Sequence, residues 1–312
     1  MLWWIIGLLA GLIFLILAIS FICFMMAFYA SRRPEKNPPE FPIPPGKIYE
    51  PYRRRMEHWI KETRALSHRE FSIVSFDGLV LKGNYYEYAP DAPIELMFHG
   101  YRGNAERDLC GGVQRCFALG HSALIVDQRA CGHSQGHVIT FGIKERKDCL
   151  SWLDLMQKEF GADAKIILTG ISMGAATVLM ASAETLPPQV KGVLADCGYS
   201  GAKAVIKKVI RQMRLPADLI YPFVRLGARL FGGFDPDETS PLEAMKNCTL
   251  PVIFFHGDAD EFVPCEMSEE NFAACSARKQ LVKIPGAGHG LAFPVDEAGY
   301  LKELGAFFAE IL

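Results

Sequence analysis

The N-terminal stretch of this chain lacks charge: no residue between Leu2 and Ala30 is charged. A bilayer span needs about 20 apolar residues, so this stretch is long enough to cross a membrane. A cleaved signal peptide is the alternative, but its basic start, shorter apolar core and small residues before the cleavage site are missing. We therefore expect an uncleaved, single-pass transmembrane anchor over residues 1–31.

Two further absences narrow the class of protein. The formal net charge is only −2 and there is no long basic run, which argues against nucleic acid as a partner. The nine cysteines include no Cys-x-x-Cys pair, so their spacing predicts neither a metal site nor a redox site. A disulfide framework is the alternative, but a chain of 312 residues does not need such crosslinks. Free thiols in a reducing compartment are favoured.

Prolines are concentrated between residues 34 and 51, where seven of the 19 in the chain lie. Such a stretch prefers extended polyproline geometry and cannot hold a helix. We predict a semi-rigid linker over 32–52 that lifts a domain at 53–312 off the membrane. A chain that starts at Pro34 should then be soluble and active, because the catalytic residues do not depend on the span. A ligand for a proline-binding domain is the alternative.

Beyond the linker, a helical pattern at 52–66 is followed by short apolar runs that alternate with helical segments. Residues 71–88 predict a β-hairpin that turns at Asp77-Gly78. Buried strands separated by helices predict an α/β fold, with a mostly parallel sheet and helices on both faces. The apolar runs are 94–98, 123–126, 165–168, 190–195, 251–255 and 280–284, and the clearest helical segments are 143–160 and 175–186.

One basic and apolar segment, at about 201–245, interrupts this alternation. Its spacing is helical, and it is inserted between two of the expected strands. Insertions that follow the carboxyl end of a strand commonly cover the site, so we predict a helical lid. A peripheral helical pair is the alternative.

The pattern Gly-x-Ser-x-Gly occurs twice, around Ser134 and around Ser172. A nucleophilic serine in this pattern lies on a tight turn between a strand and a helix, and the glycines allow close approach of neighbouring chain. Ser172 has that context, because an apolar run precedes it and a helical pattern follows. Ser134 lies eight residues beyond Val126, where an apolar run ends, and no helix pattern follows it. We predict that Ser172 is the nucleophile and that Ser134 belongs to a structural loop.

A serine nucleophile needs a general base, and the base needs an orienting carboxylate. Asp260 follows one expected strand, and His289 lies in a glycine-rich loop after the next. Their order, serine then aspartate then histidine, is one in which hydrolytic triads occur. We expect the backbone N–H groups of Tyr101 and Met173 to form the oxyanion hole.

From about residue 70 to its end, the chain resembles the α/β-hydrolase superfamily, and more narrowly the Bem46-like and prolyl-oligopeptidase-like serine hydrolases. The family's His-Gly-x-x-Asp pattern selects Asp260 rather than Asp258 as the triad acid. One position departs from the family, because Ala130 stands where the pattern Asp-x-Arg-Gly-x-Gly has its first glycine. The resemblance is carried by His99-Gly100, residues 127–134, residues 170–174, residues 256–264 and Gly288-His289-Gly290.

These observations predict a membrane-anchored serine hydrolase that cleaves a carboxylic ester through an acyl-serine intermediate. We expect a small-molecule or lipid-like acyl substrate, no cofactor and no metal. A peptidase or amidase is the alternative enzyme. An inactive, membrane-tethered binding protein is the alternative from another class, but the triad positions are intact. A dehalogenase or epoxide hydrolase would have aspartate at position 172.

The charges around the span predict its orientation in the cell membrane. No Lys or Arg precedes it, whereas Arg32, Arg33 and Lys36 follow it. Such clusters stay on the cytoplasmic side, so we expect the domain in the cytoplasm. A reporter fused after Leu312, active only in the cytoplasm, should give signal, and three lysines added before Leu2 should reduce it. A silent reporter on the unaltered chain would contradict this orientation.

Overall fold

The computed structural model describes residues 1–31 and 38–312. The cations used to predict the orientation of the span, Arg32, Arg33 and Lys36, lie outside the described residues, as does the start of the predicted linker.

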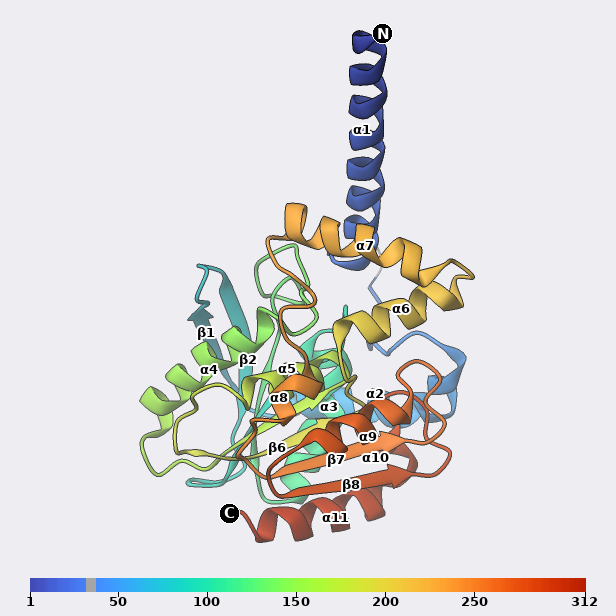
Figure 1. Ribbon diagram of the computed structural model, residues 1–312. Coiled ribbons are helices and arrows are strands. Elements are labelled where there is room, and N and C mark those ends of the chain that lie inside the picture. Colours follow the sequence, from blue (N-terminus) through green and yellow to red (C-terminus); the bar gives the residue numbers. More distant parts are fainter. Residues whose placement is uncertain (32–37) are drawn as a thin grey trace.

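An eight-stranded sheet forms the centre of the domain (Figure 1). Its spatial order is β1-β2-β4-β3-β5-β6-β7-β8; pairing is antiparallel from β1 through β2 to β4 and parallel from β4 to β8. The predicted hairpin and all six apolar runs are confirmed as strands, with small shifts of their ends. The strands are β1 Arg69–Val74, β2 Val80–Tyr86, β3 Ile94–Phe98, β4 Ser122–Val126, β5 Ile166–Ile171, β6 Val190–Asp196, β7 Val252–Gly257 and β8 Lys279–Ile284.

Helices cover both faces of this sheet because its inner strands are apolar on both sides. In β3, Leu96 and Phe98 belong to the apolar cluster that includes residues of α4 (Glu145–Phe160) and α5 (Met173–Ala181). Met97, between them, instead packs in a cluster with residues of α3 (Ala105–Ala118). The expected helices at 52–66, 143–160 and 175–186 are confirmed as α2 (Arg53–Ala65), α4 and α5. The other helices of the domain core are α9 Cys265–Ala274, α10 Ala292–Val295 and α11 Glu297–Ala309.

The segment 201–245 is helical, as its spacing predicts. It contains α6 (Ala202–Gln212), α7 (Ala217–Gly227), the π-helical turn η2 (Ala228–Gly232) and α8 (Pro241–Met245). α7 lies across the foot of the N-terminal helix α1, and α6 lies on the same side of the molecule (Figure 1).

Helix α1 (Leu2–Ala27) is long and apolar enough to cross a membrane, by length and composition, although a signal sequence would share both properties. Its first part stands clear of the domain (Figure 1). Its C-terminal end does not, because Phe24 and Phe28 are buried in an apolar cluster that includes Phe141. Where α1 crosses α7, a Cβ atom added at Gly227 would lie 2.2 Å from the carbonyl oxygen of Ser20. The helix is therefore seated directly on the domain.

Backbone pairing continues this contact beyond α1. Tyr29 forms an antiparallel bridge with Val138. The N–H of Ile139 donates to the carbonyl of Phe28 at 2.9 Å, and the N–H of Ala30 donates to the carbonyl of His137 at 2.8 Å. The end of the span and the residues after it are therefore part of the packing of the domain, whereas the activity of a chain without the span stays a prediction.

The described part of the proline-rich segment also differs from the predicted spacer. Residues Lys47–Tyr52 form the 3-10 helix η1 with Pro51 inside it, although no helix was expected there. Upstream, Phe41 and Ile43 pack against an apolar cluster that contains Trp59. A proline lacks only its own N–H, so a short turn with few internal hydrogen bonds tolerates it. The segment lies along the domain.

The seating of α1 can be tested by comparing two phenylalanines of the N-terminal segment. Phe28 has no exposed surface, whereas Phe14 is 74% exposed. Truncating a buried phenylalanine to alanine costs about 3–5 kcal/mol. We expect Phe28→Ala to lower the thermal midpoint of the domain in detergent, followed by near-UV circular dichroism, and Phe14→Ala to leave it unchanged. Equal midpoints for the two variants would show that α1 does not support the domain.

Candidate active site

Ser172 occupies the sharp turn between β5 and α5. Its backbone has φ 55° and ψ −116°, a conformation that residues other than glycine rarely adopt. Neighbouring chain passes so close that a Cβ at Gly170 would lie 2.2 Å from the carbonyl carbon of Gly174. A Cβ at Gly174 would lie 2.0 Å from the carbonyl oxygen of Phe98. Both glycines are thus required by the packing, and the turn presents Ser172 beyond the end of the strand.

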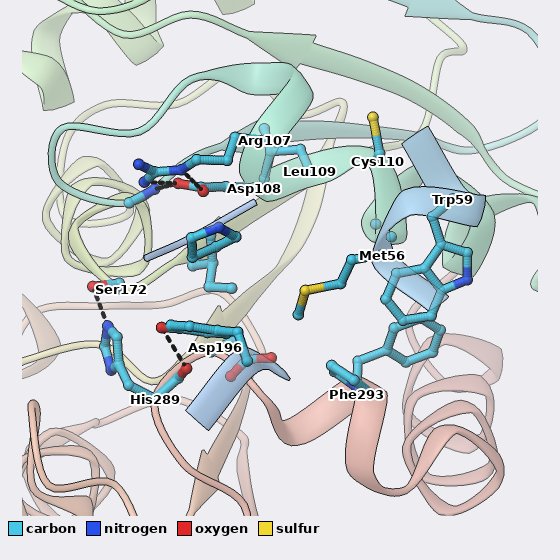
Figure 2. Close-up of a pocket in the computed structure, with 18 of the residues that line it drawn as sticks. Met56, Trp59, Arg107, Asp108, Leu109, Cys110, Ser172, Asp196, His289 and Phe293 are labelled. Atoms are coloured by element: carbon cyan, nitrogen blue, oxygen red, sulfur yellow. Dashed lines mark hydrogen bonds and ion pairs between the residues drawn. The ribbon is translucent and has the colours of Figure 1, made fainter. Parts of the chain in front are cut away.

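The structure brings Ser172, His289 and Asp260 together, although 117 positions separate the serine from the histidine. The Oγ atom of Ser172 lies 2.9 Å from Nε2 of His289 (Figure 2). Nδ1 of the same ring lies 2.6 Å from Oδ2 of Asp260. Asp258, the other carboxylate considered, is exposed, and its Oδ1 accepts the N–H of Gly286 at 2.6 Å.

Asp260 is surrounded by donors. Its Oδ1 accepts the N–H groups of Phe262 and Val263 at 2.9 and 2.8 Å. Burial acts to raise the pKa of its carboxyl group, but hydrogen bonds from His256 and His289 outweigh burial and hold the pKa well below its usual range. Asp260 therefore stays ionised and can hold the imidazole of His289 in one orientation.

His256 is the residue of this site whose role the sequence did not reveal. It is completely buried, with Nε2 2.9 Å from the carbonyl oxygen of Val263 and Nδ1 2.6 Å from Oγ of Ser268. Because a carbonyl can only accept, Nε2 carries the proton, and the same N–H faces Oδ2 of Asp260 at 3.2 Å. The only signal in the sequence is its place four residues before Asp260.

The loop after β3 passes beside the serine. A Cβ at Gly100 would lie 3.5 Å from Cβ of Ser172. Buried His99 fixes this loop: its Nε2 accepts the N–H of Gln128 at 3.0 Å, so Nδ1 carries the proton and donates to the carbonyl of Gly100 at 2.8 Å. Tyr101 follows in this loop, and Met173 is the first residue of α5, where backbone N–H groups lack acceptors inside the helix.

Ser134, the other serine in the Gly-x-Ser-x-Gly pattern, has no exposed surface. Its hydroxyl donates to the carbonyl of Asp127 at 2.6 Å and accepts the N–H of Lys82 at 2.9 Å. It therefore ties the loop after β4 to β2. Ala130 in this loop has φ 63°, so it keeps the left-handed conformation that a glycine would allow there.

A cavity of about 600 Å³ opens beside Ser172 and His289 (Figure 2). The N-terminal segment contributes much of its wall, and the hydroxyl of Tyr49 donates to the carbonyl of His289 at 3.1 Å. None of the described residues that line the cavity comes from 201–245, so the prediction of a lid over the site is wrong for this structure. The wall is mainly apolar; its larger apolar members include Ile48, Met56, Trp59, Leu109, Phe262 and Phe293.

Besides His289, the charged side chains that line the cavity are Lys47, Arg102, Arg107, Asp108, Arg115 and Asp196. Arg107 pairs with Asp108 at 2.6 Å, and Oδ2 of Asp108 also accepts the N–H of Gly100 at 3.1 Å. Asp196, at the end of β6, accepts the hydroxyl of Tyr300 at 3.0 Å, and burial raises the pKa of Asp196 to about 6. The cavity therefore combines apolar walls with a small number of placed polar groups, as binding sites for small molecules do.

Among the described residues, one group has the side-chain types of a metal site: Cys197, Asp260 and His289, whose candidate ligand atoms lie within 4.8 Å of one another. Two of its members are already joined by the hydrogen bond described above. Burial raises the pKa of the Cys197 thiol well above its usual value, so the thiolate that a metal prefers is disfavoured. The grouping is explained by the bond between His289 and Asp260.

Comparison with known proteins agrees with this geometry. A family model described as "alpha/beta hydrolase fold" matches residues 96–235. The chain has the α/β-hydrolase fold. The chain is 27% identical to YqkD of Bacillus subtilis over 240 residues, which cover 76% of the chain and 78% of YqkD. It is 26% identical to Bem46 of Schizosaccharomyces pombe over 223 residues, covering 70% of the chain and 68% of Bem46. The resemblance predicted from the motifs is confirmed.

Among solved structures, an esterase of Pyrococcus furiosus superposes with a TM-score of 0.65. The match covers 80% of this chain and 93% of the esterase at 20% sequence identity. At that identity the likeness shows the fold.

The two carboxylates after β7 provide a matched pair of variants. If Asp260 orients His289, Asp260→Asn should keep the fold and lower turnover of a p-nitrophenyl ester about 10³- to 10⁴-fold, because the imidazole then favours the wrong tautomer. Asp258→Asn should change turnover little, because Asp258 bonds only a neighbouring loop. Steady-state kinetics on both variants decides, and a reversed pair of effects would move the role to Asp258.

Proposed function

We propose that this hydrolase is a membrane-anchored serine hydrolase that cleaves a carboxylic ester. The observation that carries the proposal is the hydrogen-bonded chain from Ser172 through His289 to Asp260 at the edge of an apolar cavity. Ser172 attacks the acyl carbon while His289 accepts its proton. His289 then returns that proton to the departing alcohol oxygen, and water, activated by the same imidazole, hydrolyses the acyl-serine.

The negative charge that develops on the acyl oxygen needs donors. The backbone N–H groups of Tyr101 and Met173 are our candidates, because they lie on the two segments that flank Ser172. Preorganised donors of this kind supply a large part of the catalysis in acyl transfer. Ionised Asp260 stabilises the imidazolium of His289 in the same step.

The cavity supports an apolar acyl group, from a small-molecule or lipid-like ester. Its volume of about 600 Å³ and its apolar walls suit a hydrocarbon chain. Arg107 and Asp108 neutralise each other, so this pair offers no free charge to the terminus of a peptide. For that reason we favour an ester over a peptide.

The seating of α1 supports retention of the span as a single-pass anchor. Removal of α1 as a signal sequence would take Phe24 and Phe28 out of the apolar cluster that they fill. Truncation of buried aromatic side chains is among the most destabilising changes in protein cores. Together with the charge asymmetry of the sequence, this supports our proposal of an enzyme in the cell membrane with its catalytic domain in the cytoplasm.

A fluorophosphonate probe tests the nucleophile. Ser172→Ala should abolish labelling, whereas Ser134→Ala should keep it, because Ser134 is buried and its hydroxyl is engaged with the backbone of Asp127 and Lys82. Gel fluorescence of both folded variants gives the result. Persistent labelling of Ser172→Ala would disprove the assignment.

An ester and an amide of the same acyl group test the substrate class. We expect the p-nitrophenyl ester to be hydrolysed with the higher kcat/KM and the p-nitroanilide to be a poor substrate. A preference for the anilide in the unaltered enzyme, absent in Ser172→Ala, would favour the peptidase or amidase alternative.

A further inference from the structure

The point where α7 crosses α1 lies at a defined distance along the apolar helix. Eighteen residues, from Leu2 to Ile19, precede Ser20, which contacts Gly227 of α7. At 1.5 Å per residue they span about 27 Å, close to the roughly 30 Å hydrocarbon core of a bilayer. Only 6% of the most apolar 18-residue window of α1 is buried by protein. With α1 in a membrane, α7 therefore lies at the boundary between hydrocarbon and water.

α7 has a second apolar face in addition to its buried one. Ordinary surface helices present polar side chains on the face away from the core. Here Leu219 is 64% exposed and Leu230, just beyond the helix in η2, is 54% exposed. The two lie on opposite sides of the crossing at Gly227. The outer stripe has helical spacing and comprises exposed Leu219 and Leu230 with half-buried Phe223 and Leu226 between them. Tyr221, Val224 and Ala228 are buried on the other face.

The end of this stripe continues onto α1. The ring of Phe231, which is 41% exposed, packs edge-to-face on that of Phe21 in α1, with 5.1 Å between ring centroids. The exposed apolar surface is thus continuous with the apolar surface of α1. A bilayer that surrounds the apolar surface of α1 is therefore expected to cover the exposed apolar face of α7 and η2 as well.

The same segment carries more cations than acids pair with. Between residues 201 and 232 there are seven cations and one acid, Asp218. Lys207 pairs with Asp218, and Arg225 and Arg229 pair with Asp235 beyond this range. Arg211 and Arg214, near the turn between α6 and α7, are exposed, and neither forms an ion pair with an acid in the described part of the chain. Near an anionic membrane each such cation contributes on the order of 1 kcal/mol of attraction. The seven cations are Lys203, Lys207, Lys208, Arg211, Arg214, Arg225 and Arg229.

We propose that α7 and η2 dock on the bilayer that holds α1. Leu219, Leu230 and Phe231 enter the boundary between headgroups and acyl chains, and the cations near the α6–α7 turn lie against anionic headgroups. Amphipathic helices bind membrane surfaces by this combination of apolar burial and cationic attraction. The inference rests on the membrane anchorage proposed above. On this proposal, the α7–η2 part of the insertion is a membrane-docking surface.

Docking at this surface has a consequence for the candidate active site. Nζ of Lys208, on α6, donates to the carbonyl of Phe262 at 2.9 Å. The ring of Phe262 packs edge-to-face on that of His289, with 5.0 Å between centroids. Phe262 also lines the cavity. α6, which precedes the docked helix, therefore contacts a residue of the cavity wall, and we expect the docked surface to hold the cavity at a fixed orientation to the membrane.

Fluorescence quenching on the full-length chain in lipid nanodiscs tests the docking. The variants Leu219→Cys and Leu230→Cys are labelled with an environment-sensitive NBD fluorophore. Val74→Cys is the matched control, because Val74 is 68% exposed on β1 at the edge of the sheet. The native cysteines are buried or half-buried, and the unaltered chain treated in the same way gives their background. We expect lipids spin-labelled near the headgroup to quench the probes at 219 and 230 but not the probe at 74.

A fourth probe, at Phe14→Cys in α1, separates the failure of this inference from the failure of the anchor. Lipids spin-labelled in the acyl chain should quench the probe at 14. If they do, and if the probes at 219 and 230 are quenched no more than the probe at 74, docking is wrong and the anchor stands. If the probe at 14 is not quenched, both are wrong. Blue-shifted but unquenched emission at 219 and 230 would assign the surface to a second copy of the chain and overturn the proposal.

The contact between the cations and anionic headgroups is tested separately, by changing the charge of the lipids. Quenching at 219 should be stronger in nanodiscs that contain phosphatidylserine than in pure phosphatidylcholine. Arg211→Gln combined with Arg214→Gln should reduce that difference, whereas Lys61→Gln, an exposed cation on α2, should preserve it. If quenching does not depend on the lipid charge, the contact with anionic headgroups is wrong.

Discussion

The close approach of β3, β5 and the first turn of α5 is the constraint on which the rest of the site depends. Two glycines allow this contact, and it forces Ser172 into a conformation that costs on the order of 1–3 kcal/mol. The surrounding sheet holds the turn in place, because the N–H of Ser172 donates to the carbonyl of Asp196 on neighbouring β6 at 2.8 Å. The loops after β7 and β8 then bring Asp260 and His289 to the same edge.

A buried carboxylate at this edge would by itself be costly, since burial disfavours the charged form. Asp260 is stabilised by two backbone N–H groups and two imidazole rings. One of these rings, His256, is held by Ser268 and a backbone carbonyl, and so has a fixed tautomer. The charge of Asp260 is therefore maintained by groups that themselves have little freedom to move.

The helical insertion and the N-terminal helix complete each other's packing. Gly227 of α7 lets the backbone of α1 approach closely, and Phe28, just after α1, fills a cluster in the domain. The side chains of Tyr101 and Arg102, in the loop beside Ser172, donate to backbone carbonyls at the end of α1. The loop that carries one candidate oxyanion donor is thus held in part by the apolar helix.

The sequence determined the features that depend on local pattern. Buried parallel strands are continuous apolar runs, and a strand–serine–helix turn needs glycines at fixed positions, so the strands, the fold class and the choice of Ser172 over Ser134 could be predicted. Only the tertiary structure decided which surfaces meet. Three features join segments that no local sequence pattern connects. They are the support of Asp260 by His256, the cavity wall built by Ile48 and Trp59, and the burial of Phe28 in the domain. Apolar spacing reports that a residue is buried, but the partner that buries it is set by how helices and loops cross in space.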